Sequence, residues 1–367
     1  MLDTFVDRLW VVKGGKMRLT FKELKDEIAK IVPKSIDYTV GLEAGNIAIV
    51  TPVPEKFGGG DGLVGKIAKK VKRKIKIRPD PSIVKPETEA REIIESVIPD
   101  EAEISQLYFD GCFSEVIIQC QNPGEAVGRR GANVNEIRNR TGWIPKVERT
   151  PPIFSKSVHD VRSYRNSIAD ERKKLLKDFG LNIHRPKRPS STWVRVTALG
   201  SYREVGRACH LVTTNESRVM IDVGVNIASD TDPMPYFTAP EALPLEKLDA
   251  VVLTHSHLDH AGMLPVLFKY GYRGPVYCTP PTRDLMLLLQ TDYIKVGGAE
   301  GKRPAYDMED IRTCMKHVVD VDWGETTDIT PDIKMTFSNS GHILGSSAVH
   351  MHVADGKHNI VFSGDQK

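Results

Sequence analysis

A cluster of ligand-type side chains follows a short apolar run in the second half of the chain. The run Ala250-Val251-Val252-Leu253 is typical of a buried strand, and the segment from Thr254 to His260 adds three histidines and one aspartate. Imidazole and carboxylate groups without thiolates suit a catalytic zinc site, because they leave the metal strongly Lewis acidic toward water. The pattern therefore favours a strand that ends at a metal-binding loop over a polar loop of solvated histidines, and it indicates hydrolysis.

The spacing of this loop predicts two metal ions. His255 and His257 are expected to face one ion, whereas Asp259 and His260 face the second. His342 follows an alternating stretch at 333–339, and Asp365 follows a predicted strand at 359–362; each alone is only a loop or turn residue. Together with the first motif they complete a ligand set. The predicted metal ligands are His255, His257, Asp259, His260, His342 and Asp365.

This combination resembles the metallo-β-lactamase superfamily. The segment 218–224 reads as a strand that ends in Asp222, an acid that steadies the metal loop in such proteins. Segments 200–207 and 257–265 resemble the β-CASP nucleases within that superfamily, and the likeness covers about residues 191–367. It implies two Zn²⁺ ions and phosphodiester hydrolysis, with Asp259 or Asp365 orienting the attacking water or accepting its proton.

The amino-terminal half contains an internal repeat. At an offset of 66 residues, 23–33 align with 89–99, and Gly62-Leu63-Val64-Gly65 aligns with Gly128-Arg129-Arg130-Gly131. Each copy predicts a helix, extended segments, a glycine turn, a second helix and a final strand, an order that resembles a KH RNA-binding domain. The expected ranges are 21–32, 47–50, 66–72 and 75–77 in the first copy, and 87–98, 115–119, 133–138 and 144–147 in the second.

The glycine turn of the second copy is the stronger candidate for RNA contact. Gly128 and Gly131 allow a nucleic-acid backbone to approach a helix start, and Arg129 and Arg130 add positive charge; the alternative is a solvated basic turn. The first copy has Leu63 and Val64 at the matching positions, with Asp61 before them, which weakens the clamp.

The first copy has a basic run instead of a basic turn. Residues 66–78 contain no acid, and their cations can contact phosphates without sequence preference, although a solvated helix face is the alternative. The residues predicted to contact RNA are Lys69, Lys70, Lys72 and Arg73 in this run and Gly128, Arg129, Arg130 and Gly131 in the second turn.

These motifs predict an α/β and α+β multidomain chain. We expect two tandem KH-like α+β modules at 1–80 and 81–150, followed by a helical linker at 151–190 with a connecting helix at 157–179 and a proline-rich stretch at 186–189. A metallo-β-lactamase αββα sandwich, incomplete because the chain stops where a β-CASP insertion would begin, is expected at 191–367.

Length and composition constrain the number of domains and the kind of compartment in which the protein is expected. The 367 residues exceed the usual size of a single core, and the net charge is only +3. The five cysteines include no C-x-x-C pair, which argues against a disulfide scaffold or a thiolate zinc site and favours a reducing cytoplasm. No apolar run reaches the roughly 20 residues that a membrane span needs.

The order of the modules resembles the archaeal homologues of the cleavage and polyadenylation specificity factor. That resemblance implies an endoribonuclease that captures single-stranded RNA, acts in RNA 3′-end processing and transcription termination with the transcription machinery, and forms homodimers as a longer chain. We expect strong activity only from that longer chain. Two alternatives stay open: a non-catalytic RNA-binding subunit, and a metal-dependent hydrolase of a small ester or lactam.

Overall fold

The computed structural model describes residues 19–58, 62–186, 193–229, 231–299, 301, 303–354 and 356–367. The chain forms two compact units, an N-terminal unit at Lys22–Leu181 and a C-terminal unit that runs from Asn182 to Lys367. Parts of three expectations lie outside the described residues: the start of the first module, Asp61, and most of the proline-rich stretch. Among the described residues, none of the helices combines the length and apolar character needed to cross a membrane.

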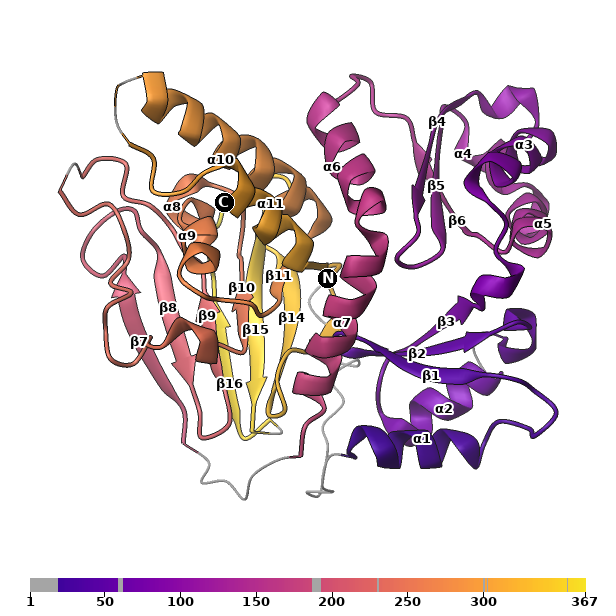
Figure 1. Ribbon diagram of the computed structural model, residues 1–367, viewed down its shortest axis with the longest axis horizontal. Coiled ribbons are helices and arrows are strands. Elements are labelled where there is room, and N and C mark those ends of the chain that lie inside the picture. Colours follow the sequence, from indigo (N-terminus) through magenta and orange to yellow (C-terminus); the bar gives the residue numbers. More distant parts are fainter. Residues whose placement is uncertain are drawn as a thin grey trace. The chain divides into compact units, whose positions relative to one another are not determined.

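The N-terminal unit contains two modules of the same topology. Each has a three-stranded sheet in which the middle strand pairs antiparallel with the strand before it and parallel with the last strand (Figure 1). This shared order bears out the repeat that the sequence analysis detected. The first module consists of α1 (Phe21–Ala29), β1 (Thr39–Glu43), β2 (Asn46–Thr51), α2 (Leu63–Val71) and β3 (Ile75–Pro79). The second consists of α3 (Glu87–Val97), β4 (Ile104–Asp110), β5 (Glu115–Cys120), α4 (Pro123–Val127), α5 (Ala132–Thr141) and β6 (Ile144–Arg149).

The two glycine turns differ. In the second module, a short 3-10 turn at Arg129–Gly131 separates α4 from α5. In the first module, α2 begins at Leu63, three residues before the predicted helix start, so that Leu63, Val64 and Gly65 are helical. The expected glycine turn of the first module was therefore wrong, because apolar Leu63 and Val64 start the helix instead of leaving a loop open to a phosphate.

The connecting segment is not a single helix. It forms α6 (Lys156–Ser167) and α7 (Ala169–Ile183), which break at Ile168, so the prediction of one continuous helix at 157–179 was wrong. Both helices are bound to the modules: the Asn166 side chain accepts a hydrogen bond from the Gly111 amide, and the Leu176 carbonyl accepts one from the Ala44 amide. These contacts make the two helices part of the N-terminal unit.

A buried guanidinium joins the two modules. Arg78 of β3 donates to both carboxylate oxygens of Glu43 at 2.7 Å and to Glu115 of the second module at 2.8 Å. Its guanidinium carbon also lies 4.7 Å from the centre of the Phe113 ring. Burial alone would raise the pKa of Glu115, but Lys146 and Arg78 outweigh it and hold that pKa below its ordinary value. The contact between the two modules therefore depends on a network of charged side chains that is largely shielded from solvent.

The C-terminal unit contains two sheets that pack face to face. The larger sheet has the strand order β12-β11-β10-β9-β8-β7, parallel from β9 to β12, and the smaller is antiparallel in the order β13-β14-β15-β16 (Figure 1). The strands are β7 (Arg195–Gly200), β8 (Cys209–Thr213), β9 (Arg218–Ile221), β10 (Ala250–Val252), β11 (Val276–Cys278), β12 (Val318–Asp320), β13 (Thr326–Asp328), β14 (Ile333–Asn339), β15 (Ser347–Val353) and β16 (His358–Phe362).

Alternating apolar residues form the core between these sheets. Val219, Ile221 and Val252 of the larger sheet lie in one buried cluster with Phe337 and Met351 of the smaller sheet. The larger sheet also carries helices that pack on one another, α8 (Leu258–Ala261), α9 (Leu264–Lys269), α10 (Pro280–Ala299) and α11 (Met308–His317). Because β9 to β12 are parallel, the loops that follow them, the turn between β7 and β8, and the loop after β14 are expected to meet at one edge.

We predict that Arg78→Ala lowers the free energy of unfolding of the N-terminal unit by about 3 to 5 kcal/mol, because Glu43 and Glu115 stay buried without their partner. Urea titration followed by circular dichroism measures this loss. Arg140→Ala is the matched control, since its ion pair with Glu136 is about half exposed and contributes roughly 0.5 kcal/mol or less. Equal losses in the two variants would contradict the importance of the buried network.

Candidate metal centre

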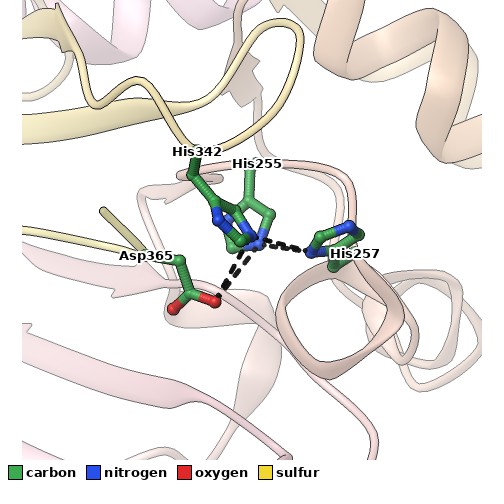
Figure 2. Close-up of side chains that lie close together, drawn as sticks. All are labelled: His255, His257, His342 and Asp365. Carbon is green, nitrogen blue, oxygen red and sulfur yellow. Dashed lines mark hydrogen bonds and ion pairs between the residues drawn. The ribbon is translucent and has the colours of Figure 1, made fainter. Parts of the chain in front are cut away.

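Four predicted ligand side chains point toward one another at the edge of the C-terminal unit (Figure 2). The Nδ1 atom of His257 lies 3.2 Å from Nε2 of His255 and 3.2 Å from Nε2 of His342. A carboxylate oxygen of Asp365 lies 3.5 Å from Nε2 of His342 and 4.0 Å from Nε2 of His255. The loops after β10, β14 and β16 thus bring three imidazoles and one carboxylate together.

A second group lies beside the first and shares His255 with it. This group contains His255, Asp259 and His260, and the ligand atoms within each of the two groups all lie within 4.8 Å of one another. The second oxygen of Asp365 lies 3.3 Å from Nε2 of His260, and Asp259 lies 3.9 Å from the same nitrogen. Asp365 therefore directs one oxygen at each group, as a bridging carboxylate must. The structure brings all six predicted ligands together.

Asp222 lies beneath the histidine loop and is not among the facing ligand atoms. Its Oδ1 accepts a hydrogen bond from the Thr254 amide at 2.8 Å, while Oδ2 accepts from the Thr254 hydroxyl and from Nδ1 of His260, each at 2.8 Å. Asp222 has a φ of +59°, a backbone conformation in which aspartate is more readily tolerated than most residues. This turn at the end of β9 directs the carboxylate under the loop.

These hydrogen bonds orient the imidazole rings. His260 uses Nδ1–H toward Asp222, and Nδ1 of His255 lies 3.0 Å from the Thr254 hydroxyl, which itself donates to Asp222. In both rings, Nε2 is left to face the ligand groups. Such outer hydrogen bonds select the tautomer that a metal ligand needs.

The two rings differ in the pKa of their imidazole groups. Burial disfavours the imidazolium form of His260, but the Asp222 carboxylate outweighs burial and raises the pKa of His260 to about 9. Burial, together with the neighbouring His260, lowers the pKa of His255 to about 4. A proton and a metal ion therefore compete for the Nε2 atom of His260, whereas the neutral His255 has a free lone pair on Nε2 for a metal ion.

The donor set fits a divalent metal. Nδ1 of His257 lies 3.2 Å from Nε2 of both His255 and His342, and a single N–H on His257 can serve only one of them, whereas a cation accepts the lone pairs of all three nitrogens at once. Three imidazoles with a carboxylate are typical of catalytic zinc, and a carboxylate that faces two groups is typical of two-metal sites.

The histidine loop is packed tightly against the neighbouring backbone. The Ala208 amide donates to the Asp259 carbonyl, and the Gly224 amide donates to the Ala208 carbonyl. A Cβ atom at Gly224 would lie 1.6 Å from the Asp259 carbonyl oxygen, so only glycine fits there. The residues before β8 and after β9 thus lie directly against the metal loop.

The loop that carries His342 is held by two threonines that the sequence analysis did not select. The hydroxyls of Thr279 and Thr282, at the start of α10, donate to the Gly345 carbonyl at 2.7 and 3.0 Å. The Ser346 hydroxyl accepts from the His342 amide at 3.1 Å. A threonine before two prolines predicts a helix start, but that signal does not reveal which distant carbonyl the hydroxyls bind.

The second predicted site, the GRRG turn, lies in the N-terminal unit. Gly128, Arg130 and Gly131 have φ values of +73°, +53° and +79°, and the side chains of Arg129 and Arg130 are exposed. The Asn133 side chain donates to the Glu125 carbonyl, which ties the helix start to the end of α4. The turn is a braced loop with two exposed cations.

The basic run of the first module is mostly exposed. Lys69 and Lys70 lie on α2, and Lys72 follows that helix, with all three side chains open to solvent. Lys70 pairs with Glu27 at 3.3 Å, and Arg73 is half-buried and donates to the Lys72 carbonyl. This arrangement is compatible both with phosphate contact and with a solvated face.

Comparisons with known proteins identify both regions. Residues 211–365 match the sequence profile described as Metallo-beta-lactamase superfamily domain, and residues 18–84 match the one described as Transcription termination factor FttA, KH domain. Over 94% of its length, the chain is 48% identical to Transcription termination factor FttA of Methanosarcina mazei, and over its whole length it is 43% identical to the protein of that name from Thermococcus kodakarensis.

The chain spans about half the length of these relatives. It covers 54% of the Methanosarcina mazei protein and 56% of the Thermococcus kodakarensis protein. The match to a KH profile falls on the first module, whose glycine turn is helical, and the second module has the same strand order. The predicted fold class was two tandem KH-like modules followed by a metallo-β-lactamase sandwich, and a KH domain followed by a metallo-β-lactamase fold is confirmed.

We predict that the double variant Thr279→Val and Thr282→Val binds Co²⁺ about 10- to 100-fold more weakly, because the His342 loop loses its anchor. Calorimetric titration and the visible absorption of bound Co²⁺ measure the change. The double serine variant keeps both hydroxyls and is expected to bind as the parent does.

A capping control accompanies that measurement. Thr279 also accepts from the Thr282 amide, so its loss weakens the start of α10. Asp307→Ala removes the cap of α11 and should lower the melting temperature without changing Co²⁺ affinity. Unaltered Co²⁺ affinity in the valine variant would show that the threonines serve stability alone.

Proposed function

The chain belongs to the KH-domain-containing metallo-β-lactamase family whose relatives are called transcription termination factor FttA, and from this premise we propose that it is a metal-dependent endoribonuclease for single-stranded RNA. The observation that carries the proposal is the convergence of six potential metal ligands from three separate loops. A silent RNA-binding subunit has no need of this cluster. A small-molecule hydrolase has no need of the exposed arginines in a KH-type turn.

In the proposed site, His255, His257 and His342 would hold one Zn²⁺ ion and Asp259 and His260 would hold a second, with the Asp365 carboxylate facing both groups. The bound ions would polarise the scissile phosphate and lower the pKa of the attacking water. Asp222 would hold Thr254 and His260 in position through its hydrogen bonds to them. Asp259, whose side chain is 35% exposed, would accept the proton of that water; Asp365, which is 45% exposed, is the alternative acceptor.

RNA capture is assigned to the N-terminal unit in this proposal. Gly128 and Gly131 let the phosphate backbone approach α5, while Arg129 and Arg130 pair with phosphates. Lys69, Lys70, Lys72 and Arg73 of the first module contribute affinity without sequence preference. The helical start of α2 argues against a backbone clamp in that module.

The proposed cellular role of the protein is taken from the name that its relatives share. Their shared name supports action in transcription termination, and we extend this to RNA 3′-end processing, contact with the transcription machinery and a cytoplasmic location. β-CASP-type nuclease chemistry and a homodimer of the full-length protein belong to the same proposal and rest on the sequence resemblance.

We predict that His257→Ala and Asp259→Ala each lower RNA cleavage at least about a thousandfold, since each removes a ligand of the proposed ions. Gel analysis of labelled RNA measures cleavage, and elemental analysis measures the bound zinc. His350→Ala is the matched control, because His350 lies half-buried on the other strand face, away from the cluster. Full cleavage by either ligand variant would refute the assignment, and preferred hydrolysis of small esters would favour the small-molecule alternative.

We predict that Arg129→Ala with Arg130→Ala weakens RNA binding and makes it less sensitive to salt. Two lost phosphate contacts should reduce the slope of log affinity against log salt by about 1.4 for single-stranded RNA. Fluorescence anisotropy at several salt concentrations gives that slope. Arg140→Ala, which removes one exposed cation farther along α5, serves as the control; an unaltered slope in the double variant would exclude the turn as a contact.

A further inference from the structure

Two loops beside the metal centre present exposed aromatic and apolar side chains. The loop between β7 and β8 carries Tyr202 and Val205, with 77% and 87% of their surfaces exposed, and the loop after β9 carries Ile227 and Tyr236, with 67% and 65% exposed. Arg203 is also exposed. We name these five residues, Tyr202, Arg203, Val205, Ile227 and Tyr236, the aromatic rim.

The topology places the aromatic rim close to the ligand cluster. β8 is antiparallel to β9, so the turn between β7 and β8 lies at the same sheet edge as the loops that follow β9 and β10. In the sheet, β8 and β7 are the second and third strands from β10, and neighbouring strands lie about 4.8 Å apart, so this turn lies roughly 10 to 15 Å from the strand that precedes the metal loop.

Backbone hydrogen bonds make the connection direct. Ala208, which ends the first loop, donates to the Asp259 carbonyl, and Val225, which begins the second, donates to the Leu258 carbonyl. The Tyr236 amide in turn donates to the Leu199 carbonyl next to the first loop. Both loops are therefore attached to the segment that carries Asp259 and His260.

The aromatic rim is held in shape. Arg207 donates to Glu204 at 2.7 Å and to Asp232 at 2.6 Å, which joins the two loops. Ser201, Arg203 and Arg207 have φ values of +59°, +61° and +42°, which are unfavourable for residues other than glycine. Such strain persists only where the surroundings enforce it, and it tends to occur at functional sites.

The chemistry of the aromatic rim suits a nucleic-acid strand. Tyrosine rings offer flat faces to bases, and the exposed Arg203 offers a cation to a phosphate. Arg207 pairs with both nearby acids, Glu204 and Asp232, and offsets one of their two negative charges. The exposed Arg203 balances the other, so the rim carries no net negative charge that would repel a phosphate. A purely apolar protein partner would use the aliphatic residues but has no need of an exposed cation among them.

We propose that the aromatic rim binds the stretch of single-stranded RNA next to the scissile phosphate, with bases against Tyr202 and Tyr236 and a phosphate at Arg203. This inference rests on the proposed function. It adds a second RNA contact in the C-terminal unit, separate from the KH-type turn, and it gives the enzyme a means to favour unpaired substrate, because paired bases cannot lie against the rings.

Steady-state kinetics of the full-length protein tests the proposal. The double variant Tyr202→Ala and Tyr236→Ala is expected to raise the KM for an unstructured oligoribonucleotide about tenfold or more. The effect on bis(p-nitrophenyl) phosphate, which is too small to reach the rim, should be much smaller. The double phenylalanine variant keeps the rings and should restore the KM for RNA.

Tyr270→Ala is the matched control. Tyr270 is 62% exposed and lies after α9, shortly before the start of β11, at the sheet edge opposite the ligand cluster. Its replacement should leave the KM for RNA unchanged. An equal rise in both alanine variants would overturn the proposal, as would an equal loss for both substrates in the rim variant.

Photocrosslinking supplies a readout that does not depend on turnover. Benzoylphenylalanine in place of Tyr202 should crosslink to single-stranded RNA more strongly than the same group in place of Tyr270, and less strongly to a duplex of the same sequence. Crosslinks to protein in place of RNA would identify the surface as a protein interface and overturn the inference. If the full-length protein cleaves no RNA, the proposed function fails. If it cleaves RNA and the KM of the rim variant for RNA is unaltered, only the proposal for the aromatic rim fails.

Discussion

The hydrogen bonds accepted by the Asp222 carboxylate are the interaction on which the site depends. One carboxylate oxygen accepts a hydrogen bond from the Thr254 amide, and the other accepts hydrogen bonds from the Thr254 hydroxyl and from His260. These contacts direct Nε2 of His255 and His260 toward the ligand groups and keep the loop after β10 in one conformation. A metal site built on a loop needs this support, because ligand rings that rotate freely lose affinity.

The remaining ligands come from the second sheet, and their placement depends on how the two sheets pack. Val252 of β10 shares a core with Phe337 and Met351, so the ends of β10, β14 and β15 are held together. From that edge, Thr279 and Thr282 hold the Gly345 carbonyl, and Asp365 follows β16. The hydrophobic core sets the distance between the two halves of the site, and short polar contacts adjust the final positions.

The side chains that the residue types and spacing singled out do lie together, since histidines and aspartates rarely cluster after buried strands without a shared ligand. The repeat also predicted that the two modules share one succession of helices and strands. What the sequence could not reveal were contacts between distant segments, such as the threonine hydroxyls on Gly345 or Arg78 between Glu43 and Glu115. The helical start at Leu63 and the break at Ile168 were missed because local propensity alone does not decide where helices begin and end.

The contact at Arg78 has a consequence for how the two repeated modules act. Because one guanidinium is shared by acids from both sheets, neither module can turn independently without exposing unpaired buried charge. The two modules therefore hold a fixed distance from one another, and an RNA strand that contacts both of them must be long enough to span it. Such a protein can distinguish RNA strands by length without contacting any base specifically.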